Sequence, residues 1–263
     1  MMNKDRLRQI WVTVAEILCV YGTLVGVGVL GSSVESSSDG ALSADATLLA
    51  PGGTAFSIWS VIYFGLFAYT VWQWLPGNTT SPRARATGWL AGISMLLNAA
   101  WILVTQQGWI WVSVGVIAAL VITLGIIMRR LTALPPQGWL DRVIVDGTFG
   151  AYLGWVSVAT CANIAAAGVA SGWSLGDGAD DWLAVAVLAA AAGVGVMLAY
   201  TIGGRFAVAA AMAWGLSWIA IARLFDEPAS SIVGIAAIIA VAVVVVVSGL
   251  RGADPGRVAV ATA

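Results

Sequence analysis

Eight apolar stretches of about 20 residues each constrain this chain more than any other feature of its sequence. At 1.5 Å per residue, a helix of that length crosses a hydrocarbon core of roughly 30 Å. With 60% hydrophobic and 10% charged residues, the chain lies outside the range of soluble domains. We therefore predict an all-α, polytopic integral membrane bundle of eight transmembrane helices. The predicted spans are 10–30, 54–75, 87–106, 109–128, 143–167, 182–203, 206–225 and 230–250.

Charged residues alternate between the connections on the two sides of this bundle. The connections on one side hold the cations Arg83, Arg85, Arg129, Arg130, Arg142 and Arg205. Those on the other side hold the acids Glu35, Asp39, Asp45, Asp177, Asp180, Asp181, Asp226 and Glu227. The positive-inside rule then predicts a multi-pass protein of the cell (inner or plasma) membrane, with both termini cytoplasmic. Arg223 is the one cation that this topology places on the acidic side.

Several chemistries are excluded by the residues that the sequence lacks. There is no histidine, which removes His-ligated metals and Ser-His-Asp catalysis, and Lys4 is the only lysine, so no Schiff base can form within the membrane. Cys19 and Cys161 lie in apolar runs and predict neither a disulfide nor a metal site. The sequence has no basic patch, so nucleic-acid binding is not predicted. The chain is expected not to be an enzyme, and its expected partners are the lipid bilayer and a small hydrophobic ligand.

The fifth apolar run carries polar and aromatic residues that a plain lipid-facing span would lack. Tyr152, Trp155, Ala159 and Asn163 fall at i, i+3, i+7 and i+11, which is one face of a helix. An unpaired amide in hydrocarbon costs a few kcal/mol, so this face must contact protein or a ligand.

Two other helices place similar residues at a similar depth. Trp59 and Trp101 lie roughly 8 Å from the predicted outer boundary, and Tyr63 and Asn98 lie roughly 12 Å from it. One interpretation is an aromatic-walled cavity for a flat apolar ligand, with Asn98 and Asn163 as its polar groups. The alternative is that these residues only pack and hydrogen-bond between helices.

Three motifs resemble those of the tryptophan-rich sensory protein family, which includes TspO, the translocator protein or peripheral benzodiazepine receptor. Segment 56–63 (FSIWSVIY) resembles its F…WxxxY motif, segment 97–101 (LNAAW) its LNxxW motif, and segment 152–163 (YLGWVSVATCAN) its YLxWVxFAxxLN motif. The resemblance extends over residues from about 9 to 168. Three further helices, from Trp182 onward, have no counterpart in five-helix members.

The resemblance implies a TspO-like five-helix core at 1–168 and a three-helix C-terminal extension of the same membrane domain at 169–263. Family members bind porphyrins, haem-type tetrapyrroles, sterols and benzodiazepine-type ligands, and are often dimeric. It therefore implies a tetrapyrrole or sterol-like ligand, a homodimer as one arrangement, and photochemical porphyrin breakdown as the one enzymatic alternative. The implied ligand positions are Trp59, Asn98, Trp101, Trp155 and Ala159.

Two acids lie inside apolar runs. Glu16 has no charged partner near it in sequence and is a candidate proton site, or a neutral acid at a helix contact. Asp146 is a second candidate proton site, but Arg142 one turn before it favours a local ion pair. The function alternative to a ligand-binding, sensory protein is thus a secondary transporter of a small amphipathic solute, proton-coupled through Glu16.

Two further features of the sequence have no role in the cavity or in the candidate proton sites. The connection 31–53 is long for a membrane hairpin, which suggests that it covers something. Trp214, Ser217 and Trp218 are spaced at i, i+3 and i+4 in the seventh helix, which is compatible with packing or with a second site.

Overall fold

The computed structural model describes residues 3–30, 34, 38–176 and 178–253. Within these residues it has eight helices that are long and apolar enough to cross a membrane, so the predicted fold class is confirmed. Three shorter segments flank them: η2 (Ser38–Gly40), η3 (Gly53–Ser57), which runs directly into α2, and the π-helical η4 (Asp141–Gly147), which runs into α5. The eight helices are α1 (Lys4–Gly26), α2 (Ile58–Trp72), α3 (Pro82–Gln106), α4 (Ile110–Thr132), α5 (Thr148–Ala170), α6 (Ala179–Ile202), α7 (Phe206–Phe225) and α8 (Ser231–Ala253).

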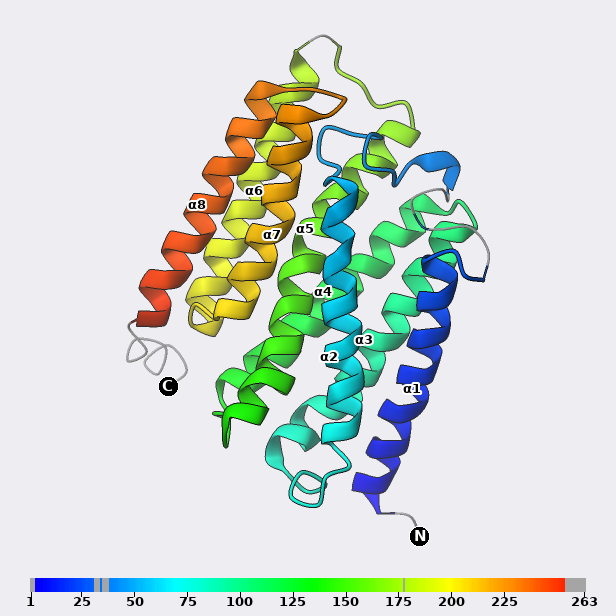
Figure 1. Cartoon of the computed structure of the whole chain (residues 1–263), viewed down its shortest axis with the longest axis vertical. Helices are drawn as coiled ribbons and strands as arrows, with labels where there is room; N and C mark the ends of the chain where they lie inside the picture. The colour runs from blue at the N-terminus through cyan, green and yellow to red at the C-terminus, as the bar shows by residue number, and fades with distance from the viewer. Residues whose placement is uncertain (1–2, 31–33, 35–37, 177, 254–263) are drawn as a thin grey trace.

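The helices run alternately up and down and form two neighbouring groups (Figure 1). In the first group α1 packs against α3, α3 against α4, and α4 against α5, while α2 contacts α1 and α5. In the second group α6 and α7 both pack against α8. The main contact between the groups is the one between α5 and α7, so α5 belongs to the interior of the whole bundle.

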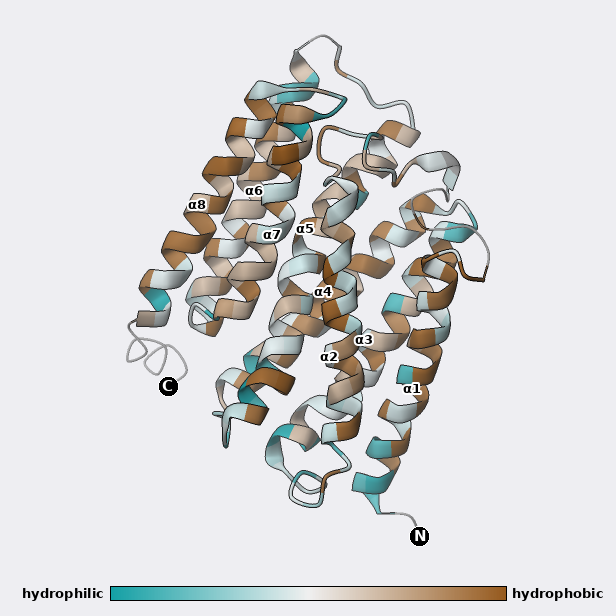
Figure 2. Cartoon of the chain, viewed as in Figure 1, coloured by the Kyte–Doolittle hydropathy of each residue, from teal (hydrophilic) through white to brown (hydrophobic). Residues whose placement is uncertain are grey.

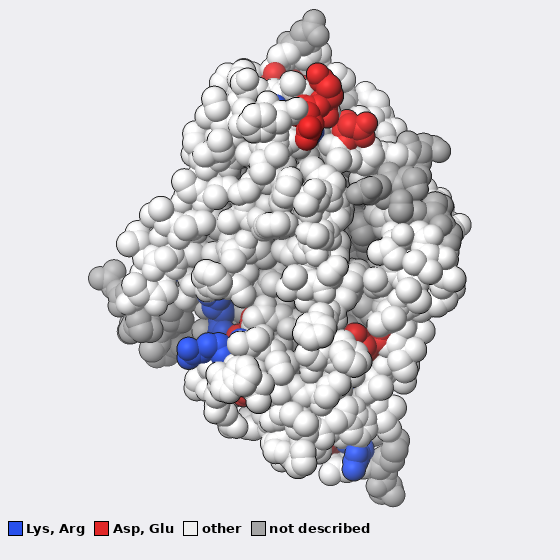
Figure 3. Space-filling model, in the orientation of Figure 1, with Lys and Arg blue, Asp and Glu red and all other residues white. Residues whose placement is uncertain are grey.

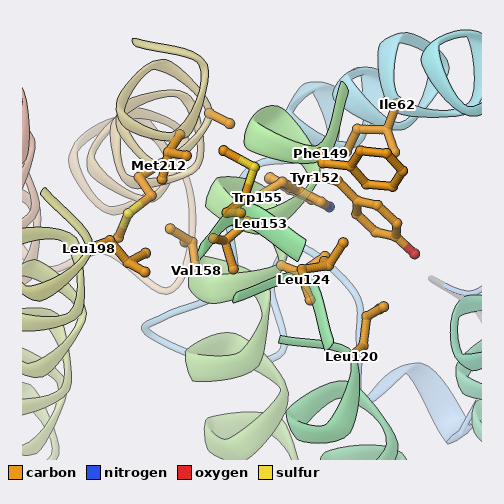
Figure 4. Close-up of a cluster of buried hydrophobic side chains, with 14 of the residues drawn as sticks. Ile62, Leu120, Leu124, Phe149, Tyr152, Leu153, Trp155, Val158, Leu198 and Met212 are labelled. Carbon is orange, nitrogen blue, oxygen red and sulfur yellow. The ribbon is translucent and has the colours of Figure 1, made fainter. Parts of the chain in front are cut away.

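Side chains leave α5 in both directions, as Figure 4 shows. Tyr152 lies on the side of Ile62 in α2, whereas Val158 extends toward Met212 in α7. The approach of α7 is close because α5 has glycine at the contact: a Cβ on Gly154 would lie 2.3 Å from the backbone oxygen of Val208. Small residues permit such close contact between membrane helices.

The two ends of the bundle differ in charge. Apolar residues cover the middle of the helices, and polar residues gather toward the ends (Figure 2). Figure 3 shows acidic side chains at the end that carries the long connection before α2, and cations toward the opposite end. We call the end where α1 begins the basic end. Which side of the membrane it faces stays a prediction, as do the homodimer and the division at residue 168.

Candidate ligand cavity

An apolar cavity lies between α2, α3, α4 and α5, near the end opposite the basic end. Its walls include six of the predicted ligand-binding residues: Trp59, Asn98, Trp101, Trp155, Ala159 and Asn163. Phe56 also lines it, although sequence reasoning used this residue only as part of a motif. The helical spacing of α5 and the depths of the other residues were therefore sufficient to place three helices around one space.

The remaining two predicted residues, Tyr63 and Tyr152, lie behind the wall rather than in it. Tyr63 stacks on Trp59, with ring centroids 5.3 Å apart and an interplanar angle of 16°. Tyr152 is fully buried, meets Trp59 edge-on at 5.9 Å, and donates its hydroxyl to the backbone oxygen of Ser94 at 3.3 Å. Both tyrosines thus support the ring that faces the cavity.

The aromatic wall is an edge-to-face cluster. The ring centroid of Trp155 lies 6.1 Å from that of Trp59 and 5.9 Å from that of Phe56, with interplanar angles of 86° and 79°. Aromatic pairs favour this geometry because the positive edge of one ring meets the negative face of the other. The cluster gives the cavity a rigid apolar side.

Residues 41–55 form one side of the cavity at its mouth; we call this segment the lid. Ala41, Leu42, Ser43, Thr47, Ala50 and Pro51 from the lid all face the cavity. The space is about 680 Å³ with its open mouth included, but the centre of a water-sized molecule fits into only about 50 Å³ of it. A dry cavity that binds benzene measures about 150 Å³. A larger ligand therefore requires the lid or the aromatic rings to move apart.

The polar groups of the cavity fall into two kinds, paired and unpaired. Asn163 accepts from Trp101 Nε1 at 2.8 Å and donates to Ser113 Oγ at 3.0 Å, so these side chains satisfy one another. Asn98 Nδ2 donates to the Tyr63 hydroxyl at 3.0 Å, but Asn98 Oδ1 accepts no hydrogen bond from the part of the chain that the structure describes.

Trp155 is the second unpaired group. Its Nε1 has no acceptor among the described residues, although the side chain is only 1% exposed. Asn98 is equally buried, at 1% exposure. An unpaired buried polar group costs roughly 1–3 kcal/mol, and such groups are rare in folded proteins. Two side chains that line the cavity, Trp155 on α5 and Asn98 on α3, thus each carry a buried polar atom that has no partner among the described residues.

The family is decided by a comparison with protein-family models. The model described as TSPO-like protein matches residues 10–250. This chain belongs to the TSPO-like family. The match extends from α1 into α8, and so includes the three helices beyond residue 168 that five-helix members lack. Searches of curated proteins and of solved structures gave no match. The chain is therefore a multi-pass membrane protein of this family, embedded in a lipid bilayer.

Asp146 of this TSPO-like protein lies at the basic end, and the predicted local ion pair with Arg142 is wrong. Its carboxylate instead contacts Arg83 Nη2 at 2.8 Å and Arg205 Nη1 at 2.6 Å. Asp141, which begins the π-helical η4, lies 3.7 Å from Arg83 Nε, so both acids of η4 contact the same cation from α3. Asp146 also lies outside the cavity walls.

Glu16 does not line the cavity, but it lies close to residues that support the cavity wall. It is 5% exposed, and its Oε2 accepts no hydrogen bond from the described residues. It interacts electrostatically with Cys19, Tyr63 and Tyr152. Cys19 in turn lies 3.7 Å from Asn98 Nδ2, which leads to the cavity. Glu16, which has no charged residue near it in the sequence, therefore lies in the interior of the bundle.

Proposed function

We propose that this TSPO-like protein binds a planar, largely apolar ligand in the cavity under the lid, as a ligand-binding or sensory protein. The observation that carries the proposal is the pair of buried polar atoms without a partner among the described residues, Trp155 Nε1 and Asn98 Oδ1, in two side chains that line an aromatic cavity. Binding sites of this kind combine apolar walls with a few polar groups that fix orientation. Tetrapyrroles, the ligand class implied by the sequence resemblance, are flat and mainly apolar and carry both donors and acceptors.

The lack of charged residues in the described cavity walls narrows the class of ligand that the cavity can bind. Neither arginine nor lysine is among its described lining residues, and its walls are almost wholly apolar. A carboxylate buried there would lose its hydration without gaining a partner. We therefore expect an uncharged edge of the ligand to enter first, with an acceptor for Trp155 Nε1 and a donor for Asn98 Oδ1.

The proposal is tested by quenching of tryptophan fluorescence on titration with protoporphyrin IX, in detergent or nanodiscs. Ala159→Leu adds volume inside the narrow cavity and should weaken binding at least tenfold. Ala190→Leu, on an exposed position of α6, is the matched control and should bind like the wild type. Equal affinity for all three proteins would remove the cavity as the binding site.

The expected preference for an uncharged edge has its own test. The dimethyl ester of protoporphyrin IX has the same ring without the two carboxylates, so it should bind at least as tightly as the free acid. Binding of the free acid alone would show that a cation outside the described cavity walls takes part.

A second candidate function, proton-coupled transport, is favoured by Glu16 alone. A buried acid with an unpaired oxygen inside a membrane bundle is a functional candidate by default. Glu16→Gln keeps the size of the side chain but cannot release a proton. It should abolish uptake of an amphipathic solute into proteoliposomes if the protein is such a transporter, and leave porphyrin binding intact if it is a ligand-binding protein.

A further inference from the structure

Arg223, the cation that breaks the predicted charge pattern, is buried at the lid end of α7. It is 1% exposed, and its guanidinium donates to backbone oxygens of two segments. Nη1 donates to Thr47 at 3.1 Å and Pro228 at 2.8 Å, and Nη2 donates to Ala44 at 3.2 Å and Glu227 at 3.5 Å. Arg223 therefore ties the lid to the turn between α7 and α8.

Two further hydrogen bonds join α7 to the lid. Trp214 Nε1 donates to the backbone oxygen of Ala55 at 2.9 Å, and the backbone N–H of Gly52 donates to the oxygen of Trp218 at 3.3 Å. Gly52 also packs on the Trp218 ring, since a Cβ there would lie 3.4 Å from Cε3. The seventh-helix tryptophans, which the sequence left between packing and a second site, thus contact the lid.

The lid also carries charge that complements Arg223. Asp45 lies within electrostatic reach of the Arg223 guanidinium, as do Asp226 and Glu227. The Ser43 hydroxyl donates to Asp45 at 2.5 Å, and this hydrogen bond is the main cause that lowers the pKa of Asp45, with the Arg223 charge a smaller one. A buried cation is costly unless it is hydrogen-bonded, and the lid supplies two backbone oxygens that accept from Arg223.

We propose that α7 anchors the lid, and that Arg223 and Trp214 are positioning residues which set how readily ligand enters and leaves the cavity. The inference rests on the proposed function for its ligand, but not for the anchor itself. Its basis is that α7 grips the lid at residues 44, 47, 52 and 55, between and beside the lid residues that face the cavity, while α7 itself contributes nothing to the cavity walls. Through α7, the part of the chain beyond residue 168 thereby acts on the pocket without lining it.

Two variants separate the anchor from a general effect on α7. Arg223→Met removes bonds to both the lid and the α7–α8 turn, whereas Trp214→Phe removes only the bond to Ala55 and keeps an aromatic ring. Trp111→Phe is the matched control, because Trp111 Nε1 donates to Ser171 Oγ at the same end of the bundle and not to a lid residue.

Hydrogen–deuterium exchange of the ligand-free protein in nanodiscs reads the lid directly. We expect amides of residues 41–55 to exchange about five- to tenfold faster in Trp214→Phe, since one hydrogen bond is lost, and faster still in Arg223→Met. Exchange should be unchanged in Trp111→Phe. Unchanged exchange of the lid in both α7 variants would overturn the anchor.

Stopped-flow release of protoporphyrin IX then tests control of access. Both α7 variants should release the porphyrin at least fivefold faster than the wild type and the Trp111→Phe control. A lid that loosens in exchange while release stays at the wild-type rate would overturn the control of access. If the wild type binds no porphyrin, the proposed function fails, and the exchange experiment still decides whether α7 anchors the lid.

Discussion

Trp72 and Trp155 are both almost fully buried, at 1% exposure each, yet they lie in opposite chemical surroundings. At the basic end, Trp72 Nε1 donates to Asp141 Oδ1 at 3.0 Å, and its ring stacks on Tyr69, whose hydroxyl bonds to Thr87 at 2.9 Å. At the lid end, Trp155 faces the cavity with its Nε1 unpaired. Trp72 therefore stabilises the fold through a hydrogen bond, whereas the indole N–H of Trp155 is left without an acceptor among the described residues.

The difference extends to the surroundings of the two rings. Around Trp72, the buried cation Arg83 joins Asp141 and Asp146 and donates to the backbone oxygen of Leu134, linking α3 to η4 and the connection before it. Around Trp155 there are apolar side chains, a narrow space and a lid. The polar contacts around Trp72 thus stabilise the fold, whereas the buried N–H of Trp155 has no partner among the described residues.

The largest expected effect comes from breaking the basic end. Arg83→Met leaves Asp141 and Asp146 without their shared buried cation, and should lower the free energy of unfolding by about 3–5 kcal/mol. Chemical denaturation in detergent measures it. Arg129→Met, at an exposed position of α4, should stay within about 0.5 kcal/mol of the wild type. A loss below about 1 kcal/mol for Arg83→Met would show that the network is not structural.

An intermediate effect is expected from the contact that holds the two helix groups together beside Trp155. Gly154→Ala places a Cβ against the backbone oxygen of Val208, which cannot move without shifting α7, and should cost about 1–3 kcal/mol. Gly193→Ala in α6 meets no atom within 4 Å and should be neutral or slightly stabilising. Thermal unfolding of both variants checks this, and equal melting temperatures would contradict the close α5–α7 packing.

The smallest effect comes from comparing the two tryptophans directly. Trp72→Phe loses a hydrogen bond to a carboxylate, whereas Trp155→Phe loses none, so Trp72→Phe should cost about 1–2 kcal/mol more unfolding free energy. Porphyrin affinity should show the reverse order, falling in Trp155→Phe and holding in Trp72→Phe. Denaturation and porphyrin titration of both variants measure the two quantities. If the same variant lost more unfolding free energy and more porphyrin affinity, the two tryptophans would not have the different roles assigned to them.

The helices were predictable because the bilayer fixes their length, and the cavity because helical spacing fixes which residues share a face. These two rules predicted that six residues lie around one space, and all six line the cavity: Trp59, Asn98, Trp101, Trp155, Ala159 and Asn163. Neither rule needs knowledge of contacts between distant parts of the chain.

Long-range partners were not predictable in this way. Asp146 was expected to pair with Arg142, four residues away, but its partners are Arg83 and Arg205, which lie 63 and 59 residues away in the sequence. Arg223 lies 176 residues from its lid partner Thr47. Its place among acids on the predicted acidic side was the one visible signal of a structural role.

The most direct test follows the indole N–H of Trp155 itself. In two-dimensional NMR of protein labelled with ¹⁵N-tryptophan, with Trp155 and Trp72 assigned from their phenylalanine variants, protoporphyrin IX dimethyl ester is titrated in. If the cavity is the binding site and its free donor meets the ligand, the Trp155 Nε1–H signal should move saturably downfield while that of Trp72 stays in place. A saturable shift of other tryptophans with Trp155 unmoved would place the ligand elsewhere and contradict the role assigned to this cavity.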